Sequence, residues 1–268
     1  MCLLLLALNR VPHRPWLLLG NRDEFHARPT APAQVWSDAP QIFGGRDLAA
    51  GGSWLALSRN GRFAAVTNVR GGPTQAAPRS RGELVGDFVK GTAAPDDYLA
   101  VIAARRDEYG PFNLVVGDAA GAGFVSSVDG VARGLEDGVH AFSNGSPADD
   151  WPKMHRLRGR FAALIARDDE SATQARHSGN ARDRLDEALL DLLFDTAQPE
   201  DDALPNTGIG IDLERRLAPI FVMPIGVKGD TYGTRASTLA YAQGSELVLR
   251  ERRYDAQANV SGESALIF

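Results

Sequence analysis

Residues 1–24 read MCLLLLALNRVPHRPWLLLGNRDE, in which two apolar runs, Cys2–Leu8 and Trp16–Gly20, flank a polar stretch that contains two prolines. Apolar runs on either side of a proline-punctuated turn indicate a β-hairpin. A turn centred near residues 12 and 13 would pair position 2 with position 23. The hairpin would therefore place the single cysteine of the chain beside Arg22 and Asp23.

The composition is that of an ordinary soluble globular protein. The chain has 268 residues, of which 44% are hydrophobic and 24% charged, and we expect one domain over residues 1–268. The net charge is −5, from 29 basic and 34 acidic residues, and no basic cluster stands out. These features argue against a nucleic-acid or anionic-membrane surface, leave a small molecule as the expected partner, and do not address the oligomeric state.

Cysteine content and apolar runs indicate the compartment. One cysteine excludes an internal disulfide framework and a multi-cysteine zinc site, and it suits a reducing environment. The opening apolar run has no basic segment before it and no small-residue cleavage site. No run approaches the roughly 20 apolar residues of a membrane span. We expect a cytoplasmic protein without integral membrane association.

Glycine and proline punctuate the next part of the chain. The proline-rich segment 28–40 is expected to be a loop, and the glycine pairs at 44–45 and 51–52 indicate either a tight loop lining a pocket or a plain turn. Strands are expected over Trp54–Ser58 and Arg62–Asn68, because Asn60-Gly61 between them is a strong hairpin signal. Counting outward from that turn places Ser53 opposite Asn68.

The remaining pattern alternates groups of strands with groups of helices. Helices are expected over Glu83–Lys90, Pro95–Glu108, Trp151–Arg167 and Ala181–Phe194, with a polar linker at 168–180. A strand meander is expected over Phe112–Asp118, Gly123–Asp129 and Val139–Ser143, and later strands over Ile220–Val227, Ser237–Ala242 and Glu246–Tyr254. No βαβ alternation occurs, so the fold class is α+β, with two largely antiparallel sheets sandwiched between helix layers.

Cys2 is the first candidate for chemistry. A thiol is a strong nucleophile near neutral pH once a neighbour lowers its pKa or removes its proton. Removal of the initiator methionine would give Cys2 a free α-amine, with an ordinary pKa of about 7.7–8.0, that can act as its base. The structural alternative is a small apolar residue that begins a buried strand.

Arg22 and Asp23 have two interpretations. In the catalytic one, Arg22 stabilises the thiolate or an anionic intermediate and Asp23 orients the amine or the substrate. In the structural one, they form an ion pair at a strand end, with Asn21 and Glu24 completing a polar turn. Only the cysteine predicted opposite favours the first interpretation.

Other polar residues follow predicted strands. Asn68, Arg70 and Asn144 are amide and guanidinium candidates for an oxyanion site, and Arg235 could bind a carboxylate in bidentate fashion. Each of them alone is also typical of a turn. The histidines at 13, 26, 140, 155 and 177 show no metal-binding spacing, and the glycine-rich segments match no phosphate-binding loop, so no metal or cofactor is required.

The motifs together resemble one family. They are MC at the start, NRDE at 21–24, GGRD at 44–47, GGSW at 51–54, TNVR at 67–70, SRG at 80–82, FNL at 112–114, SNG at 143–145, WPK at 151–153, LPNTG at 204–208 and YGTR at 232–235. In this order they resemble the NRDE family, also called the transport and Golgi organisation 2 family. The match spans nearly the whole chain.

That family in turn resembles the N-terminal-nucleophile (Ntn) hydrolases, which implies a four-layer αββα fold. The resemblance implies Cys2 as nucleophile, Arg22 and Asp23 as its supports and Asn144 as an oxyanion donor. Substrate binding is assigned to polar and aromatic side chains of the motifs, namely Asn21, Ser53, Trp54, Asn68, Arg70 and Arg235.

Two functions follow from these residues. The first is an Ntn-type cysteine amidohydrolase or acyltransferase that acts on a small amide or thioester. The second is a non-catalytic protein that binds and traffics haem or a lipid or acyl ligand in the same cleft, because family members are linked to haem trafficking and to lipid or acyl-CoA metabolism. The sequence contains no substrate-specificity motif that decides between them.

Overall fold

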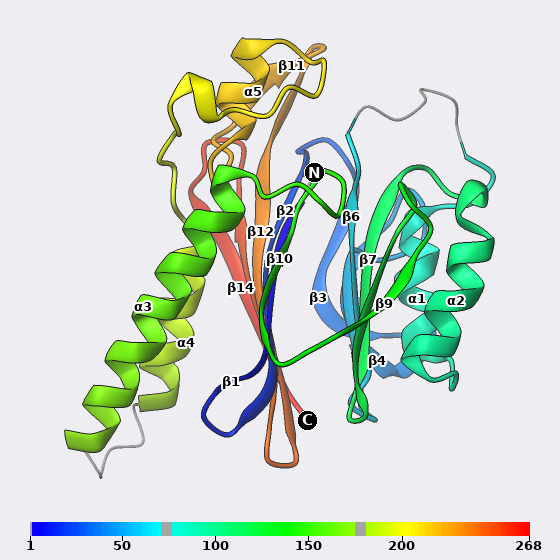
Figure 1. Cartoon of the computed structure of the whole chain (residues 1–268), viewed down its shortest axis with the longest axis vertical. Coiled ribbons are helices and arrows are strands. Elements are labelled where there is room, and N and C mark those ends of the chain that lie inside the picture. The colour runs from blue at the N-terminus through cyan, green and yellow to red at the C-terminus, as the bar shows by residue number, and fades with distance from the viewer. Residues whose placement is uncertain (1, 71–76, 175–180) are drawn as a thin grey trace.

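A computed structural model describes residues 2–70, 77–174 and 181–268, in which two antiparallel sheets lie face to face (Figure 1). The first sheet has the order β10(Gly138–Phe142), β1(Cys2–Val11), β2(Arg14–Phe25), β12(Asp230–Gln243), β13(Glu246–Tyr254) and β14(Val260–Ile267), and β11(Ile225–Val227) also pairs with β12. The second has the order β3(Thr30–Trp36), β4(Ala39–Asp47), β5(Leu55–Ser58), β6(Phe63–Asn68), β7(Phe112–Asp118), β8(Gly121–Ser126) and β9(Ala132–Leu135).

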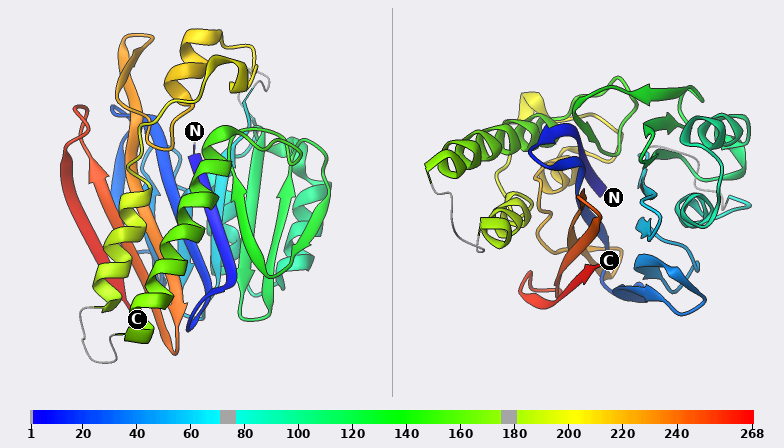
Figure 2. Two further views of the ribbon diagram at one scale, coloured as in Figure 1. Left: turned by 60° about the vertical axis from the view of Figure 1, so that its left-hand side comes forward. Right: turned by 90° about the horizontal axis from the view of Figure 1, so that it is seen from below.

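Helices cover the outer face of each sheet, as the view from below shows (Figure 2). Helices α3(Pro152–Gln174) and α4(Ala181–Leu192) pack on the first sheet, and α1(Arg81–Lys90) and α2(Pro95–Ala104) pack on the second. Helix α5(Ile211–Leu217) lies beside β11 at one end of the sandwich, and short 3₁₀ turns occur at Arg106–Glu108 and Asp201–Ala203. The αββα arrangement expected from the sequence is therefore confirmed.

The apolar run of β1 is continuous because both faces of the strand are buried. Leu3 and Leu5 belong to the core beneath α3 and α4, whereas Leu4 and Leu6 belong to the core between the two sheets. Successive side chains of a strand point to opposite faces, so a strand buried on both sides needs apolar residues throughout. No helix in the described part of the chain is long and apolar enough to cross a membrane.

The first hairpin forms as expected, but its register differs by one residue. Cys2 pairs with Arg22 rather than with Asp23, because a bulge interrupts the ladder between Leu8 and Val11. Asn9 within this bulge has a φ of 51°, a left-handed conformation that asparagine tolerates better than most residues. The bulge adds one residue to β1 and shifts every pair beyond it.

The second hairpin also forms, and it too is shifted by one residue. Leu55 pairs with Ala65, and this register, extended along the strands, brings Gly52 rather than Ser53 opposite Asn68. The prediction that residues 28–40 form a loop is wrong, because they contain β3 and the start of β4. Proline is tolerated there because β3 is an edge strand. Gly44 and Gly45 lie in β4 rather than in a loop.

Other differences concern the ends and partners of elements. The meander consists of β7, β8 and β9, the last of which was not expected, whereas β10 crosses to the first sheet and pairs with β1. Helix α2 ends at Ala104, and α3 continues through part of the expected linker to Gln174; residues 175–180 of that linker lie outside the described residues. The strand expected over 220–227 covers only Ile225–Val227. Helix α5 and strand β14 were also missed.

Candidate functional site

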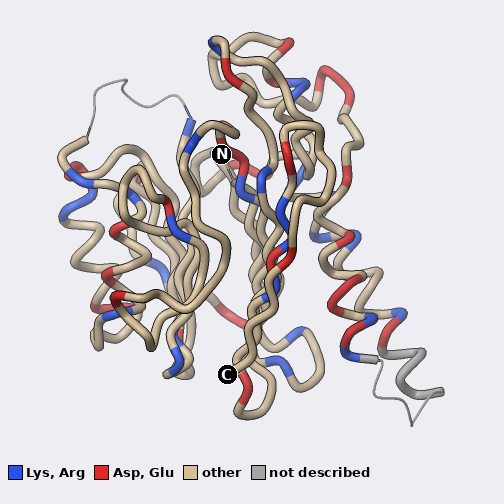
Figure 3. Tube along the Cα trace, turned by 180° about the vertical axis from the view of Figure 1, so that it is seen from behind, with Lys and Arg blue, Asp and Glu red and all other residues tan. Residues whose placement is uncertain are grey.

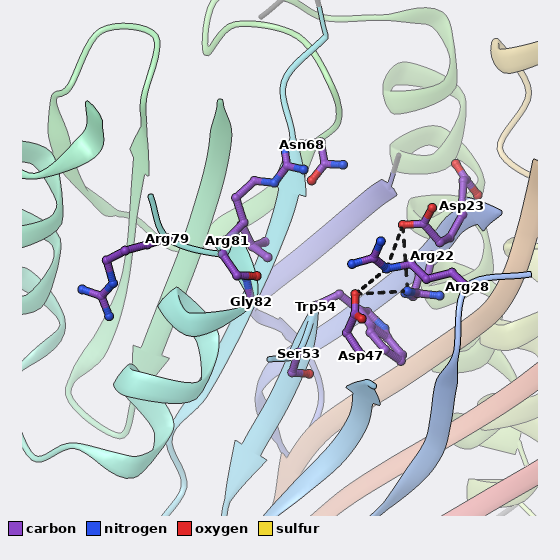
Figure 4. A pocket seen from close by; sticks show the side chains of 13 residues that line it. Arg22, Asp23, Arg28, Asp47, Ser53, Trp54, Asn68, Arg79, Arg81 and Gly82 are labelled. Atoms are coloured by element: carbon purple, nitrogen blue, oxygen red, sulfur yellow. Dashed lines mark hydrogen bonds and ion pairs between the residues drawn. The ribbon is translucent and has the colours of Figure 1, made fainter. Parts of the chain in front are cut away.

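A cavity of about 190 Å³, called here the central cavity, opens between the two sheets at the end where β1 begins. Figure 4 shows Arg22, Arg28 and Asp47 on one side and Asn68, Arg81 and Gly82 on the other, with Ser53 and Trp54 between them. Charged segments of both signs surround the start of β1 (Figure 3). The described lining residues are Arg22, Asp23, Glu24, Arg28, Asp47, Ser53, Trp54, Val66, Asn68, Arg79, Ser80, Arg81 and Gly82.

Arg22 connects the cysteine strand to this cavity. Its Cα is paired with that of Cys2, its side chain is only 5% exposed, and its guanidinium stacks on Trp54 at 4.3 Å from the ring centroid. The nearest carboxylates in the described chain, Glu24 and Asp47, lie 3.9 Å and 3.8 Å from Nη2, and Nη1 has no hydrogen-bond partner. Within the described residues, no carboxylate contacts this buried cation at hydrogen-bond distance.

Asp23 is held from the neighbouring strand β12. The Thr234 hydroxyl donates a 2.6 Å hydrogen bond to Asp23 Oδ1, and the Tyr232 hydroxyl donates one of 3.1 Å to its backbone carbonyl. Burial raises the pKa of Asp23 above its ordinary value of 3.8, although Lys153, the Thr234 hydrogen bond and Arg70 act in the opposite direction. A buried carboxyl with a raised pKa beside a cavity is typical of groups that transfer protons.

Arg28 and Asp47 close the cavity on the side of β4. Arg28 Nε donates to Asp47 Oδ2 at 2.7 Å, and the backbone N–H groups of Ala49 and Ala50 donate to Oδ1 at 3.0 and 3.1 Å. Burial opposes ionisation of Asp47, but the hydrogen bond from Arg28 and those from the backbone prevail and lower the pKa of this carboxyl. Asp47 therefore stays charged near neutral pH, and its charge is directed to Arg28 more than to Arg22.

The glycine pairs allow close packing around the cavity. A Cβ on Gly52 would lie 2.4 Å from the backbone of Gly82, so these glycines let the start of α1 dock against the start of β5. Ser53 N–H donates to the Gly82 carbonyl at 3.2 Å in the same contact. A Cβ on Gly45 would lie 2.2 Å from the Trp54 ring, so Gly45 makes room for the indole on which Arg22 stacks.

Asn68, Arg70 and Asn144 tie the two sheets together at this end. The Asn144 side chain donates to the Asn68 carbonyl at 2.8 Å, and the Arg70 N–H donates to the Asn144 carbonyl at 2.8 Å. Asn68 lines the central cavity, whereas Arg70 and Asn144 line a separate cavity near α5. Arg70 forms a buried 2.7 Å ion pair with Glu214, and burial lowers its pKa. Of these three candidates, only Asn68 reaches the central cavity.

Asn21 and Arg235 also lie outside the central cavity. The Asn21 side chain donates to the carbonyls of Leu193 and Ile220, at 2.9 and 2.8 Å, and accepts from Ser237 at 2.7 Å. Arg235 is the extra residue of a bulge in β12, where the ladder shifts between Thr234 and Ala236. The structure thus places Arg22, Asp23, Ser53, Trp54 and Asn68 around one cavity and separates Asn21, Arg70, Asn144 and Arg235 from it.

Five charged residues of the described cavity lining were not assigned a role from the sequence, namely Glu24, Arg28, Asp47, Arg79 and Arg81. Three of them lie in quoted motifs, NRDE, GGRD and SRG, so the motifs contained the signal although no single residue did. Arg28 lies in the segment expected to be a loop. Within the described chain, no group of three histidine, cysteine, aspartate or glutamate side chains is arranged to hold a metal ion.

Comparison with known proteins gives a consistent family match. The family model described as Transport and Golgi organisation 2 matches residues 1–256. The Transport and Golgi organization protein 2 homologs of Bos taurus and Homo sapiens are each 31% identical to the chain, over 236 and 234 residues. The homolog of Mus musculus is 28% identical over 238 residues. Each of these matches covers 83% of this chain and 80% of the relative.

Solved structures show weaker likeness. The C2A mutant of conjugated bile acid hydrolase from Clostridium perfringens superposes with a TM-score of 0.49 at 8% identity, over 99% of this chain and 92% of that one. The Caenorhabditis elegans ortholog of N-acylethanolamine-hydrolyzing acid amidase gives a TM-score of 0.37 at 9% identity, over 89% and 92%. The two-sheet, four-layer arrangement is given by the strands and helices of this chain itself.

Proposed function

This chain belongs to the Transport and Golgi organisation 2 family, and from that premise we propose that it transfers or hydrolyses the acyl group of a small amide or thioester, with Cys2 as nucleophile. The observation that carries the proposal is the pairing of Cys2 with Arg22, whose buried guanidinium lines the central cavity. A nearby cation lowers the pKa of a thiol and so raises its thiolate fraction.

The proposed reaction needs only groups of this chain and water. After removal of Met1, the Cys2 amine takes the thiol proton and the sulfur attacks the substrate carbonyl carbon. The Asn68 side chain and backbone N–H groups stabilise the oxyanion. The C–N or C–S bond then breaks, and the amine returns the proton to the leaving group. Water, or another acceptor nucleophile, attacks the acyl-enzyme thioester and releases the acyl group and the thiol.

The size and lining of the central cavity favour a small substrate over haem. Its volume of about 190 Å³ is below the roughly 300–1,000 Å³ of pockets that bury drug-sized ligands. Its described lining contains no histidine or methionine that could bind iron. A larger cavity, of about 640 Å³, lies at the opposite end of the sandwich, and its described lining also lacks such a ligand. The ligand chemistry of these two described linings therefore supports a small acyl substrate more than haem.

Mass spectrometry of the intact protein tests the proposal directly. Because the chain has one cysteine, any thiol adduct of iodoacetamide must form on Cys2, and a rapid single addition reports on that residue. We expect loss of Met1, rapid alkylation, and an acyl adduct after brief exposure to an N-acetylcysteamine thioester. Arg22→Met should slow alkylation severalfold, whereas Arg105→Met, which removes a half-exposed arginine of the outer helix layer, should not.

Two results would contradict the proposal. One is a retained Met1 or an unreactive thiol. The other is thioester hydrolysis that is unchanged in Cys2→Ala. Binding of haemin with a Soret band that Cys2→Ala leaves intact, together with no acyl adduct, would instead support the carrier function that the family resemblance implies.

A further inference from the structure

A further cavity, distinct from those described above, lies next to the central cavity. Its volume is about 180 Å³, and it is called here the lateral cavity. The two cavities share Arg22 and Trp54 in their linings, so the stacked pair forms the wall between them. The lateral cavity extends over β12 and β13 toward β3, away from the start of α1. Arg22 therefore lies between the reacting group of a molecule in the central cavity and the space of the lateral cavity.

The register of the first sheet explains why this space exists. Cys2 pairs with Arg22, Arg22 with Ala236, and Ala236 with Arg253, so these residues form one row across four strands. The small side chain of Ala236 leaves a gap in this row between Arg22 and Arg253. Adjacent strands are about 4.8 Å apart, so the gap lies roughly 10 Å, two strand spacings, from the backbone of Cys2.

The charges around the lateral cavity are only loosely paired, because the carboxylates nearest to Arg22 in the described chain, Glu24 and Asp47, lie 3.9 and 3.8 Å from its Nη2. Arg22 has an unpartnered buried nitrogen, as described above. Arg235 Nη1 donates to three neutral oxygens, the carbonyls of Phe25 and Arg28 at 3.1 and 2.6 Å and the Thr30 hydroxyl at 3.2 Å. No ion pair of Arg235 occurs among the described residues.

The one acidic side chain in the described lining is already engaged. Glu251 Oε1 accepts from the Ala33 N–H at 2.9 Å and from Arg253 Nη1 at 3.1 Å. Burial lowers the pKa of Arg235 and the charge of Arg22 lowers it further, so the two guanidinium groups repel each other, although Glu24, Asp47 and Asp230 act in the opposite direction. An anion placed between them would relieve that repulsion.

We propose that the lateral cavity is a carboxylate-binding subsite formed by Arg22 and Arg235, and that it selects acyl substrates with a second, distal carboxylate. Planar guanidinium groups match carboxylate oxygens in bidentate geometry. The gap over Ala236 is two strand spacings, roughly 10 Å, from the backbone of Cys2. A five-carbon diacid spans about 5 Å between its terminal carbons at bond lengths near 1.5 Å, and the lengths of a cysteine side chain and of a guanidinium–carboxylate contact account for the rest. This inference rests on the proposed acyl transfer for the identity of its substrate.

Direct binding tests the subsite without requiring turnover. Isothermal titration of the intact protein with glutarate and with pentanoate compares ligands of equal chain length that differ in one carboxylate. We expect glutarate to bind about 10- to 100-fold more tightly, as one or two hydrogen bonds to a charged group allow. Ala236→Leu, which fills the gap, and Arg235→Met should each remove most of this difference, and Arg105→Met should retain it.

Two variants are needed because Arg235 also tethers the segment after β2, and misfolding of Arg235→Met would remove the binding preference without testing the subsite. Ala236→Leu removes the space and keeps every charge. Equal affinities of the wild-type protein for glutarate and pentanoate would overturn the subsite. So would a preference for glutarate that both variants retain.

Turnover separates this inference from the proposed function. The glutaryl and pentanoyl thioesters of N-acetylcysteamine are compared by kcat/KM, and we expect a preference of about tenfold or more for glutaryl that falls in Ala236→Leu. Glutarate binding without turnover of either thioester would support the subsite and contradict acyl transfer. Turnover without preference would support acyl transfer and overturn the subsite.

Discussion

Strand β2 carries two buried arginines, Arg14 at its start and Arg22 near its end, whose surroundings differ in one respect. Both side chains are at most 5% exposed, and both stack on an aromatic ring, Arg14 on Tyr241 at 3.7 Å and Arg22 on Trp54 at 4.3 Å. Arg14 contacts Asp186 of α4 at 2.9 Å, whereas the nearest carboxylate to Arg22 is 3.8 Å away.

This difference separates a structural arginine from one available to a ligand. A buried charge is costly unless a partner compensates it within the protein. Arg14 has that partner and lies against α4, far from the central cavity. Arg22 lacks it at hydrogen-bond distance and lies between two cavities. The longer ion pairs of Arg22, at 3.8 and 3.9 Å, leave its guanidinium able to contact an anionic substrate or a thiolate at hydrogen-bond distance.

Removal of the partner of Arg14 should have the largest effect on stability. We expect Asp186→Ala to lower the free energy of unfolding by about 3–5 kcal/mol, because it leaves a buried guanidinium without its carboxylate. Urea denaturation measures the loss. The double variant Arg14→Met/Asp186→Leu should recover most of it, and a loss below about 1 kcal/mol in the single variant would show that Arg14 needs no partner.

Tyr241→Phe tests the same cluster with a smaller change. The Tyr241 hydroxyl donates to Asp186 Oδ2 at 2.7 Å and accepts from Arg182 Nε at 2.9 Å. Burial, assisted by the hydrogen bond to Asp186, raises the pKa of Tyr241 to about 12, so the hydroxyl remains a donor at neutral pH. We expect a loss of about 1–3 kcal/mol in urea denaturation, because Asp186 keeps its burial and loses a donor. An unchanged midpoint would contradict this.

The two arginines also show what the sequence could and could not predict. Arg22 became a candidate because its neighbour in the hairpin, Cys2, lies close in sequence and the alternation of apolar runs is a local signal. The sequence did not make Arg14 a candidate, because its partner Asp186 lies on a helix far along the chain. Contacts between distant elements depend on how sheets and helices pack, which local patterns do not encode.

The same limit explains the errors of register and partner. A single residue with positive φ, Asn9, shifted the Cys2 pairing by one position, and nothing in the apolar pattern marks it. The prolines between 28 and 40 suggested a loop, although an edge strand tolerates them. The clustering of Ser53, Trp54 and Asn68 was predictable because a tight turn determines which strand ends meet, whereas the position of Asn144 depended on β10 crossing between sheets.

Arg22→Met should change stability far less than Asp186→Ala. The variant loses the stacking of a cation on Trp54, and it also removes a buried charge whose nearest described carboxylates lie 3.8 and 3.9 Å away, so the two effects oppose each other. We expect the free energy of unfolding to change by less than about 1 kcal/mol in urea denaturation. A loss comparable to that of Asp186→Ala would make Arg22 a structural arginine like Arg14 and would remove the basis for its assignment to a ligand.

The last test concerns how the free energy of unfolding changes with pH because of Asp23, the residue after Arg22. Because burial raises the pKa of this carboxyl in the folded protein, the folded state holds a proton that the unfolded state has already released. Wild-type stability should therefore fall, relative to Asp23→Asn, as pH rises from the ordinary pKa of about 3.9 through the raised value. The asparagine retains an oxygen that can accept from Thr234.

Urea denaturation of both proteins at a series of pH values from 4 to 8 measures this difference. The stability of Asp23→Asn minus that of the wild type should increase with pH and then level off above the raised pKa. A difference that is flat, or that decreases with pH, would mean that the charges of Lys153 and Arg70 compensate the burial of Asp23. The carboxyl would then be compensated in the way that Asp186 compensates Arg14, and a proton-transfer role for Asp23 would lose its support.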